Sequence, residues 1–193
     1  RFRRRWTAFV AMLMAERRAA GKDEGAPPRD LFDLMDAARD PETGESFTDP
    51  QLGDQVATMI LAGHETTATA LFWSLYLLAL DPATQEELAA EVKVPNGNGA
   101  FDIERLKFTR AVVDETMRLY PPAFLIARAA AGPDTIAGMA VKPGDVILIA
   151  PWLLHRHEKL WDEPNAFKPS RFMPGATPPD RFAYLPFGAG PRV

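Results

Sequence analysis

The chain contains no cysteine among its 193 residues, so its own side chains cannot form a disulfide bond or a thiolate metal site. Histidine is scarce as well, with three in all. His155 and His157 stand two positions apart and would point to different sides of a helix, which argues against a metal-binding pair. We therefore expect no metal ligand within these residues.

Long apolar runs are also missing. A membrane-spanning helix needs about 20 uninterrupted apolar residues, and His64 and Glu65 break the longest candidate. The basic start at residues 1–5 has no small-residue cleavage site after it, which favours a solvated helix face over a signal peptide. The net charge of -4 predicts no general attraction to nucleic acid. We expect a cytoplasmic protein with no nucleic-acid partner and no membrane segment in this part of the chain.

The composition is that of a globular domain, with 47% hydrophobic and 25% charged residues. Up to residue 119, apolar positions recur mostly at helical spacing. Between residues 126 and 149 the pattern changes to short segments separated by glycine and proline, which predicts a small antiparallel sheet. The predicted fold class is therefore mainly α with a small antiparallel β-sheet (α+β). The predicted helices cover residues 1–20, 30–39, about 50–80, a stretch from 82 onwards, 103–119 and a short piece after 151.

The longest predicted helix has clear boundaries. Thr48 or Asp49 supplies an N-cap and Gln51 a capping box, while Asp81-Pro82 ends this helix and starts the next one. About 30 residues at 1.5 Å each give a rod of about 45 Å. Because the helix is so apolar, we expect it to run through the middle of a larger structure. In the next helix, the side chains expected to face solvent are Glu86, Glu87 and Glu91.

Residues 62–67 place an unusual group inside the long helix. Gly63 costs about 1 kcal/mol relative to alanine, which suggests that something flat or bulky needs access to the backbone. The hydroxyl of Thr66 can bond to the carbonyl of Ala62 and bend the helix, and Glu65 beside it needs a polar task or partner. The alternative is a buried helix with a tolerated glycine and a paired glutamate. A zinc-protease site is a poor match, because its second histidine would fall on Ala68.

Glu115 and Arg118 stand three positions apart, so both charges lie on one face of the predicted helix 103–119. If this pair is buried, its remaining donors need acceptors. Arg171 is a second arginine that could join the pair and tie the C-terminal segment to the helix. The alternative is a common surface ion pair.

The segment 187–193, Phe-Gly-Ala-Gly-Pro-Arg-Val, is a glycine-rich turn with an arginine. It does not match a dinucleotide-binding loop, since the third glycine of that motif would fall on Val193. A rigid turn of this kind suits close approach to a planar anionic ligand, whose carboxylates Arg192 could bind.

In this order, the three blocks resemble the signatures of the cytochrome P-450 family of haem-thiolate monooxygenases. Residues 152–157 and 167–172 are similar to the family as well, so the resemblance covers essentially the whole chain. It implies a partial cytochrome P-450 fold with a long central helix, residues 1–193 being the C-terminal portion of a single domain whose N-terminal part is missing. It also implies that the cysteine that ligates the haem iron follows immediately after Val193.

The resemblance implies roles for particular residues. Glu65 and Thr66 would be catalytic residues that relay protons. The residues expected at the haem are Ala62, Gly63, Arg128, Phe187, Gly190 and Arg192. The two arginines would bind its propionates, and Ala62 and Gly63 would form a kink that makes room for oxygen. A structural charge network would join Glu115, Arg118 and Arg171. Candidates for the substrate pocket, for which ordinary core packing is the alternative, are Phe124, Leu125 and Ile126.

For the whole protein, the resemblance implies insertion of one oxygen atom of O2 into an organic, hydrophobic substrate. Electrons would come from NAD(P)H through a ferredoxin- or flavoprotein-type reductase, and the 193-residue chain alone is expected to be inactive. One alternative is a degenerate, haem-free homologue that acts as a binding or interaction domain. Another is an unrelated helical protein whose basic first helix binds a partner or nucleic acid.

Overall fold

The computed structural model describes residues 2–21, 26–93 and 103–190. The chain divides into two compact units, Arg1–Glu65 and Thr66–Val193. The boundary lies within the long helix α3 (Asp49–Leu80), so each unit includes part of that helix.

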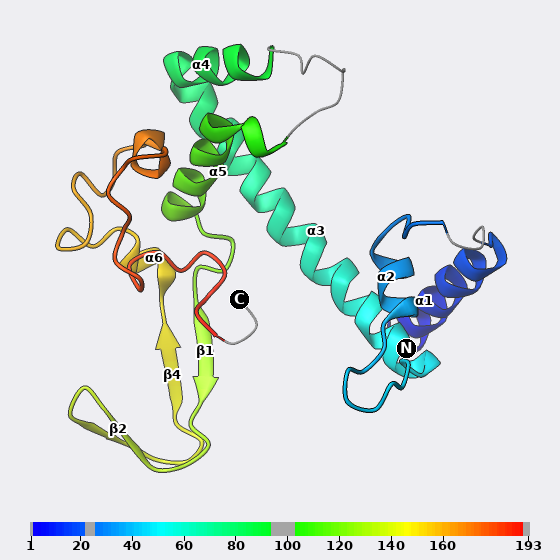
Figure 1. Cartoon of the computed structure of the whole chain (residues 1–193). Helices are drawn as coiled ribbons and strands as arrows, with labels where there is room; N and C mark the ends of the chain where they lie inside the picture. The colour runs from blue at the N-terminus through cyan, green and yellow to red at the C-terminus, as the bar shows by residue number, and fades with distance from the viewer. Residues whose placement is uncertain (1, 22–25, 94–102, 191–193) are drawn as a thin grey trace. The chain divides into compact units, whose positions relative to one another are not determined.

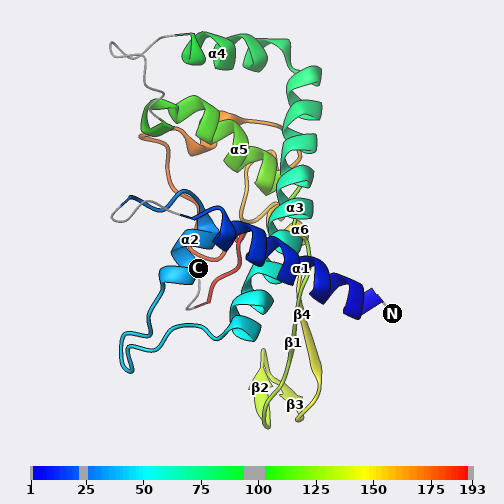
Figure 2. The ribbon, with the colours of Figure 1, turned by 90° about the vertical axis from the view of Figure 1, so that its right-hand side faces the viewer.

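The first unit consists of α1 (Phe2–Ala19), α2 (Leu31–Ala37) and the beginning of α3. Its small core joins α1 to α3, as the crossing of these helices in Figure 2 shows. The buried core residues are Val10, Met14, Leu52 and Val56. Burial of these four side chains stabilises the crossing by removing apolar surface from water.

Ion pairs add to this core. Arg18, in the last turn of α1, bonds to Asp36 of α2 at 3.0 Å and to Asp49 of α3 at 2.9 Å. Asp30 caps α2 by accepting a hydrogen bond from the Asp33 amide. Hydrogen bonds from Arg29 hold the pKa of Asp33 well below its usual range. The basic end of α1 is therefore paired with acidic residues of its own unit.

Helix α3 confirms the predicted long helix, with 32 residues (Figure 1). At its start, the side-chain oxygen of Gln51 accepts a hydrogen bond from the Thr48 amide at 2.9 Å, which is one half of the predicted capping box. The described residues do not cover this helix on every side. Several large apolar side chains of α3 are between 58% and 66% exposed: Leu61, Leu71, Phe72, Leu75 and Leu80.

The second unit begins with the rest of α3 and continues with α4 (Pro82–Val92), the short 3-10 helix η1 (Ile103–Arg105) and α5 (Lys107–Leu119). Asp81 caps α4 as predicted. The predicted outward orientation of Glu91 is wrong. Its carboxylate accepts hydrogen bonds from the amide groups of Phe108 and Thr109, both at 2.8 Å, and so caps α5, which has no side-chain cap of its own.

The β-structure is confirmed as small and antiparallel, but it forms two pairs of strands. Strand β1 (Ile126–Ala129) pairs with β4 (Val146–Ile149), with Ile126 opposite Ile149. Strands β2 (Asp134–Ile136) and β3 (Met139–Val141) form a hairpin beyond the end of that pair (Figure 1). The tight turn of the hairpin holds Ala137 and Gly138 at φ values of 49° and 80°.

After β4 the chain forms α6 (Pro151–Leu154), a long irregular segment and the 3-10 helix η2 (Pro169–Phe172). The core of this unit centres on α5, and Trp73 of α3 stacks on Tyr120 with 3.9 Å between ring centres. The apolar residues buried around α5 and the irregular segment are Phe108, Ala111, Val112, Met117, Leu119, Trp161, Ala183 and Leu185. The C-terminal segment is thus anchored on α5.

Two features are absent from the described residues. No helix there is long and apolar enough to cross a membrane. The same residues contain no cluster of histidine and carboxylate side chains that could hold a metal ion.

Candidate functional site

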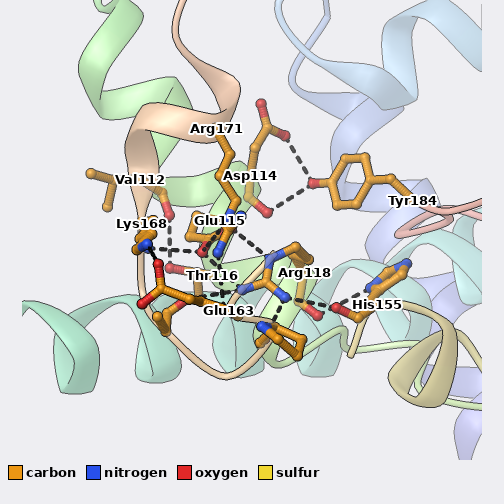
Figure 3. Close-up of polar contacts among 12 residues, drawn as sticks. Val112, Asp114, Glu115, Thr116, Arg118, His155, Glu163, Lys168, Arg171 and Tyr184 are labelled. Carbon is orange, nitrogen blue, oxygen red and sulfur yellow. Dashed lines mark hydrogen bonds and ion pairs between the residues drawn. The ribbon is translucent and has the colours of Figure 1, made fainter. Parts of the chain in front are cut away.

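Arg118, in the last turn of α5, is fully buried, and all five of its N–H groups have acceptors (Figure 3). Nε and Nη2 donate to the two carboxylate oxygens of Glu115 at 2.7 and 2.9 Å. The remaining three donors bind the main-chain carbonyls of His155, Pro164 and Ala166, at 2.7, 2.7 and 3.0 Å. A buried guanidinium with every donor satisfied is the arrangement in which such a charge is tolerated.

Glu115 is equally buried and accepts more than the two bonds from Arg118. The Lys168 amide donates to Oε1 at 2.8 Å, and Nε of Arg171 lies 3.4 Å from the same oxygen. The structure therefore brings together the three residues of the predicted charge network. The contribution of Lys168 comes from its main chain, so no side-chain pattern in the sequence indicates it.

Two of the carbonyl groups around the arginines come from one tight bend. Glu163 has a left-handed backbone, with φ of 43°, which is unfavourable for a residue with a side chain. Its carbonyl accepts from Arg171 at 2.9 Å, and the next one, of Pro164, accepts from Arg118. The bend at Glu163 thus turns successive carbonyls toward two positive charges and ties the irregular segment to α5.

The fully buried His155 and the partly buried Tyr184 are polar residues that the sequence analysis did not identify as part of this site. Nε2 of His155 accepts from the Leu185 amide at 2.7 Å, and the Tyr184 hydroxyl donates to the main-chain carbonyl of Asp114 at 2.9 Å. Burial lowers the pKa of His155 to about 4 and raises the pKa of Tyr184. Both side chains are therefore uncharged at neutral pH. Their bonding partners lie far away along the chain, so no local sequence pattern indicates that His155 and Tyr184 belong to this site.

The start of β1 lies next to the glycine-rich loop. A Cβ placed on Gly188 would stand 3.8 Å from the Cδ1 atom of Ile126, and Gly188 has φ of 87°. Phe124, Leu125 and Phe187 are 62%, 45% and 72% exposed, so this part of the unit carries uncovered apolar side chains. The structure thus brings one substrate-pocket candidate, Ile126, close to the predicted haem-binding loop.

Arg128, on β1, is exposed, and its Nη1 donates to the carbonyl of Ala127 at 2.8 Å. Within the described part of the chain no carboxylate pairs with it. A Cβ on Gly190 would meet no atom within 4 Å. Arg192, the other predicted propionate ligand, lies outside the described residues.

The motif 62–67 of α3 is helical without interruption, and all of its residues are exposed. The space beside Gly63 is open, since a Cβ there would meet no atom within 4 Å. Ala62, Gly63 and Glu65 belong to the first unit and Thr66 to the second. Their predicted roles therefore rest on the motif itself.

Side chains of the second unit suit the propionates and the apolar ring of a haem group. Arg128 offers a positive charge without a carboxylate partner among the described residues, and Gly190 has open space beside it. The uncovered Phe124, Leu125 and Phe187 suit contact with an apolar macrocycle or substrate. A thiolate to ligate the iron is not available from these residues, because the chain has no cysteine.

Comparison with known proteins identifies the family. The family model for cytochrome P-450 matches residues 1–193, so the chain belongs to the cytochrome P-450 family. The crystal structure of a cytochrome P-450, CYP102L1, superposes with a TM-score of 0.80 at 31% identity, covering 100% of this chain and 47% of that one. The predicted fold class and the predicted resemblance are both confirmed.

Two curated relatives come from Streptomyces melanosporofaciens. Cyclooctatin synthase is 40% identical over 84% of this chain and 36% of its own length. Cyclooctat-9-en-7-ol 5-monooxygenase is 36% identical over 94% of this chain and 40% of its own length. The chain thus spans well under half of the length of these relatives.

Proposed function

We propose that this chain is part of a single, larger cytochrome P-450 domain that works as a haem-dependent monooxygenase. The match of the family model to residues 1–193 carries this proposal. It is supported by the buried network of Glu115, Arg118 and Arg171, which ties α5 to the segment that leads into the glycine-rich loop.

In this proposal, bound haem supplies the chemistry that activates O2 and transfers one of its oxygen atoms to the substrate. The chain's own residues hold and surround that group. Arg128 and Arg192 bind its propionates through charge-assisted hydrogen bonds. Phe187 and Gly190 lie against the macrocycle, with the thiolate ligand supplied by a cysteine outside these 193 residues.

The motif on α3 serves proton delivery. Ala62 and Gly63 leave the space that the oxygen molecule needs, in keeping with the open volume beside Gly63. The hydroxyl of Thr66 would pass its proton to the oxygen molecule and regain one from Glu65, the only carboxylate within the motif 62–67. Glu115, Arg118 and Arg171 maintain the fold and take no part in the chemistry.

The proposed substrate is a small hydrophobic compound. Phe124, Leu125 and Ile126 would contact it, and the first two are uncovered apolar side chains in the structure. One relative is named for its action on cyclooctat-9-en-7-ol, which makes that compound a suitable probe. Electrons from NAD(P)H through a ferredoxin- or flavoprotein-type reductase and a cytoplasmic location complete the proposal.

The role of Thr66 is tested by the substitution Thr66→Ala in the complete gene product. With cyclooctat-9-en-7-ol and a surrogate reductase, we expect Thr66→Ala to lower product formed per NADPH consumed, because electrons are used without productive proton delivery. Thr67→Ala, which removes the adjacent exposed hydroxyl, is the matched control and should keep the ratio. An unchanged ratio in Thr66→Ala, with turnover of the probe demonstrated, would refute the proton-delivery role.

A further inference from the structure

His155 is a fully buried imidazole whose two nitrogens both contact the main chain. Figure 3 shows His155 beside Arg118. Nε2 is 2.7 Å from the amide nitrogen of Leu185, and Nδ1 is 3.1 Å from the carbonyl oxygen of Arg118. An amide can only donate, so Nε2 must be the unprotonated nitrogen. Nδ1 therefore carries the hydrogen and donates it to the Arg118 carbonyl. The two contacts fix both the tautomer and the uncharged state of the ring.

These two contacts join distant parts of the second unit. Arg118 lies in the last turn of α5, where carbonyl groups have no partner within the helix. The Gly188 amide donates to the carbonyl of Leu185 at 3.2 Å, which closes a turn over residues 185–188. Gly188 in turn approaches Ile126 of β1. The ring of His155 thus connects the end of α5 to the first turn of the glycine-rich loop.

Tyr184, which precedes Leu185, provides a second connection of the same segment to α5. The hydroxyl of Tyr184 donates to the carbonyl of Asp114, and its ring lies 5.3 Å from that of His155. Burial, together with the adjacent Asp114, raises the pKa of Tyr184, so the hydroxyl keeps its proton between neutral and acidic pH. Burial also raises the pKa of the Asp114 carboxylate, which the hydroxyl contacts at 3.1 Å, but the bond to the Asp114 main-chain carbonyl does not depend on that charge. Of the two connections, only the one through His155 relies on an uncharged ring.

The positively charged groups around His155 disfavour protonation of its ring, and the nearby carboxylates are bonded to other side chains. The guanidinium of Arg118, on α5, donates to the carbonyl of His155 itself, and Arg156 follows it in the chain. Glu115 is engaged by Arg118, and Asp114 by Tyr184. Burial lowers the pKa of His155 from 6.5 to about 4, and the two arginines act in the same direction. No described carboxylate bonds to the imidazole.

We propose that His155 is a positioning residue that holds the turn at residues 185–188, which leads into the glycine-rich loop, on α5 only while its imidazole is uncharged, and that protonation releases this turn while Tyr184 stays bonded to α5. A protonated ring would present an N–H group to the Leu185 amide, and two donors at 2.7 Å cannot form a hydrogen bond. The inference rests on the proposed function only in assigning haem binding to the loop that this turn leads into. The release itself is a property of these residues alone.

The test is hydrogen–deuterium exchange of the complete gene product between pH 7 and pH 4, corrected for the intrinsic pH dependence of exchange. If opening of residues 185–188 returns the His155 pKa from about 4 to 6.5, the opening constant rises about a hundredfold over this range. We expect that loss of protection in residues 185–188, with little change in α5 residues 111–117. A change below about threefold in residues 185–188 would overturn the proposal.

Two variants separate positioning by the imidazole from general acid sensitivity. His155→Gln can accept the Leu185 amide through its side-chain oxygen without titrating, so its protection should not fall with pH. His157→Gln, at an exposed histidine two residues away, should keep the wild-type profile. Equal acid sensitivity in His155→Gln and wild type would also overturn the proposal. If His155→Gln does not fold, the pH dependence of exchange in the wild type alone decides the proposal. Haem content of the wild type at pH 7 tests the proposed function separately.

Discussion

The substitution Arg118→Lys should destabilise the protein strongly although it keeps the positive charge. Arg118 places five N–H groups on five acceptors, two on Glu115 and three on main-chain carbonyls. An ammonium group has three N–H donors, so at least two buried acceptors lose their partner. Each unsatisfied buried acceptor costs about 1–3 kcal/mol, so two of them give a loss of about 2–6 kcal/mol. That is a large share of the about 5–15 kcal/mol that stabilises a typical domain.

The assay is urea unfolding of the complete gene product followed by circular dichroism, from which the free energy of unfolding is extrapolated. Arg110→Lys is the matched control, because the same change is made on α5 at a side chain that is 77% exposed and lies 3.7 Å from Asp114. Its expected effect is below about 1 kcal/mol, since exposed ion pairs contribute little. If Arg118→Lys were no more destabilising than Arg110→Lys, the role assigned to the five buried hydrogen bonds would be wrong.

Two further predictions concern single contacts that the structure reveals. Glu91→Ala should lower the free energy of unfolding, measured in urea, by about 1–2 kcal/mol, because α5 loses its cap at Thr109. Glu87→Ala, at an exposed position on the same helix as Glu91, is the control. Ala137→Asn should slow amide exchange in the β2–β3 hairpin by a factor of about 2 to 5, since asparagine tolerates the left-handed φ of 49° before Gly138 better than alanine does. Faster exchange there would contradict the turn geometry.

Local signals made much of the fold predictable. Thr48 and Gln51 indicated the start of α3, and Asp81-Pro82 indicated both its end and the start of α4. These signals work because caps and prolines act on the first turn of a helix, within a few residues along the chain. The spacing of Glu115 and Arg118 indicated a pair in the same way.

Other features depend on partners that no local pattern reveals. Glu91 was expected to face solvent, yet it caps a helix that begins 16 residues later, at Lys107. His155 depends on two main-chain groups, 37 and 30 residues away in the sequence. The apolar character of α3 predicted that it runs through the middle of a larger structure, whereas its Leu71 and Leu75 are 58% and 66% exposed here. An apolar face shows that burial is favourable but does not identify what covers it.

The most direct test of the central claim is a carbon monoxide difference spectrum of the reduced, complete gene product that contains this chain. The proposed function predicts the characteristic band of a thiolate-ligated ferrous haem, with haem present at about one equivalent per protein. A well-folded preparation that binds haem without that band, or binds no haem, would contradict the claim. It would instead support a degenerate homologue that keeps the cytochrome P-450 fold without its chemistry.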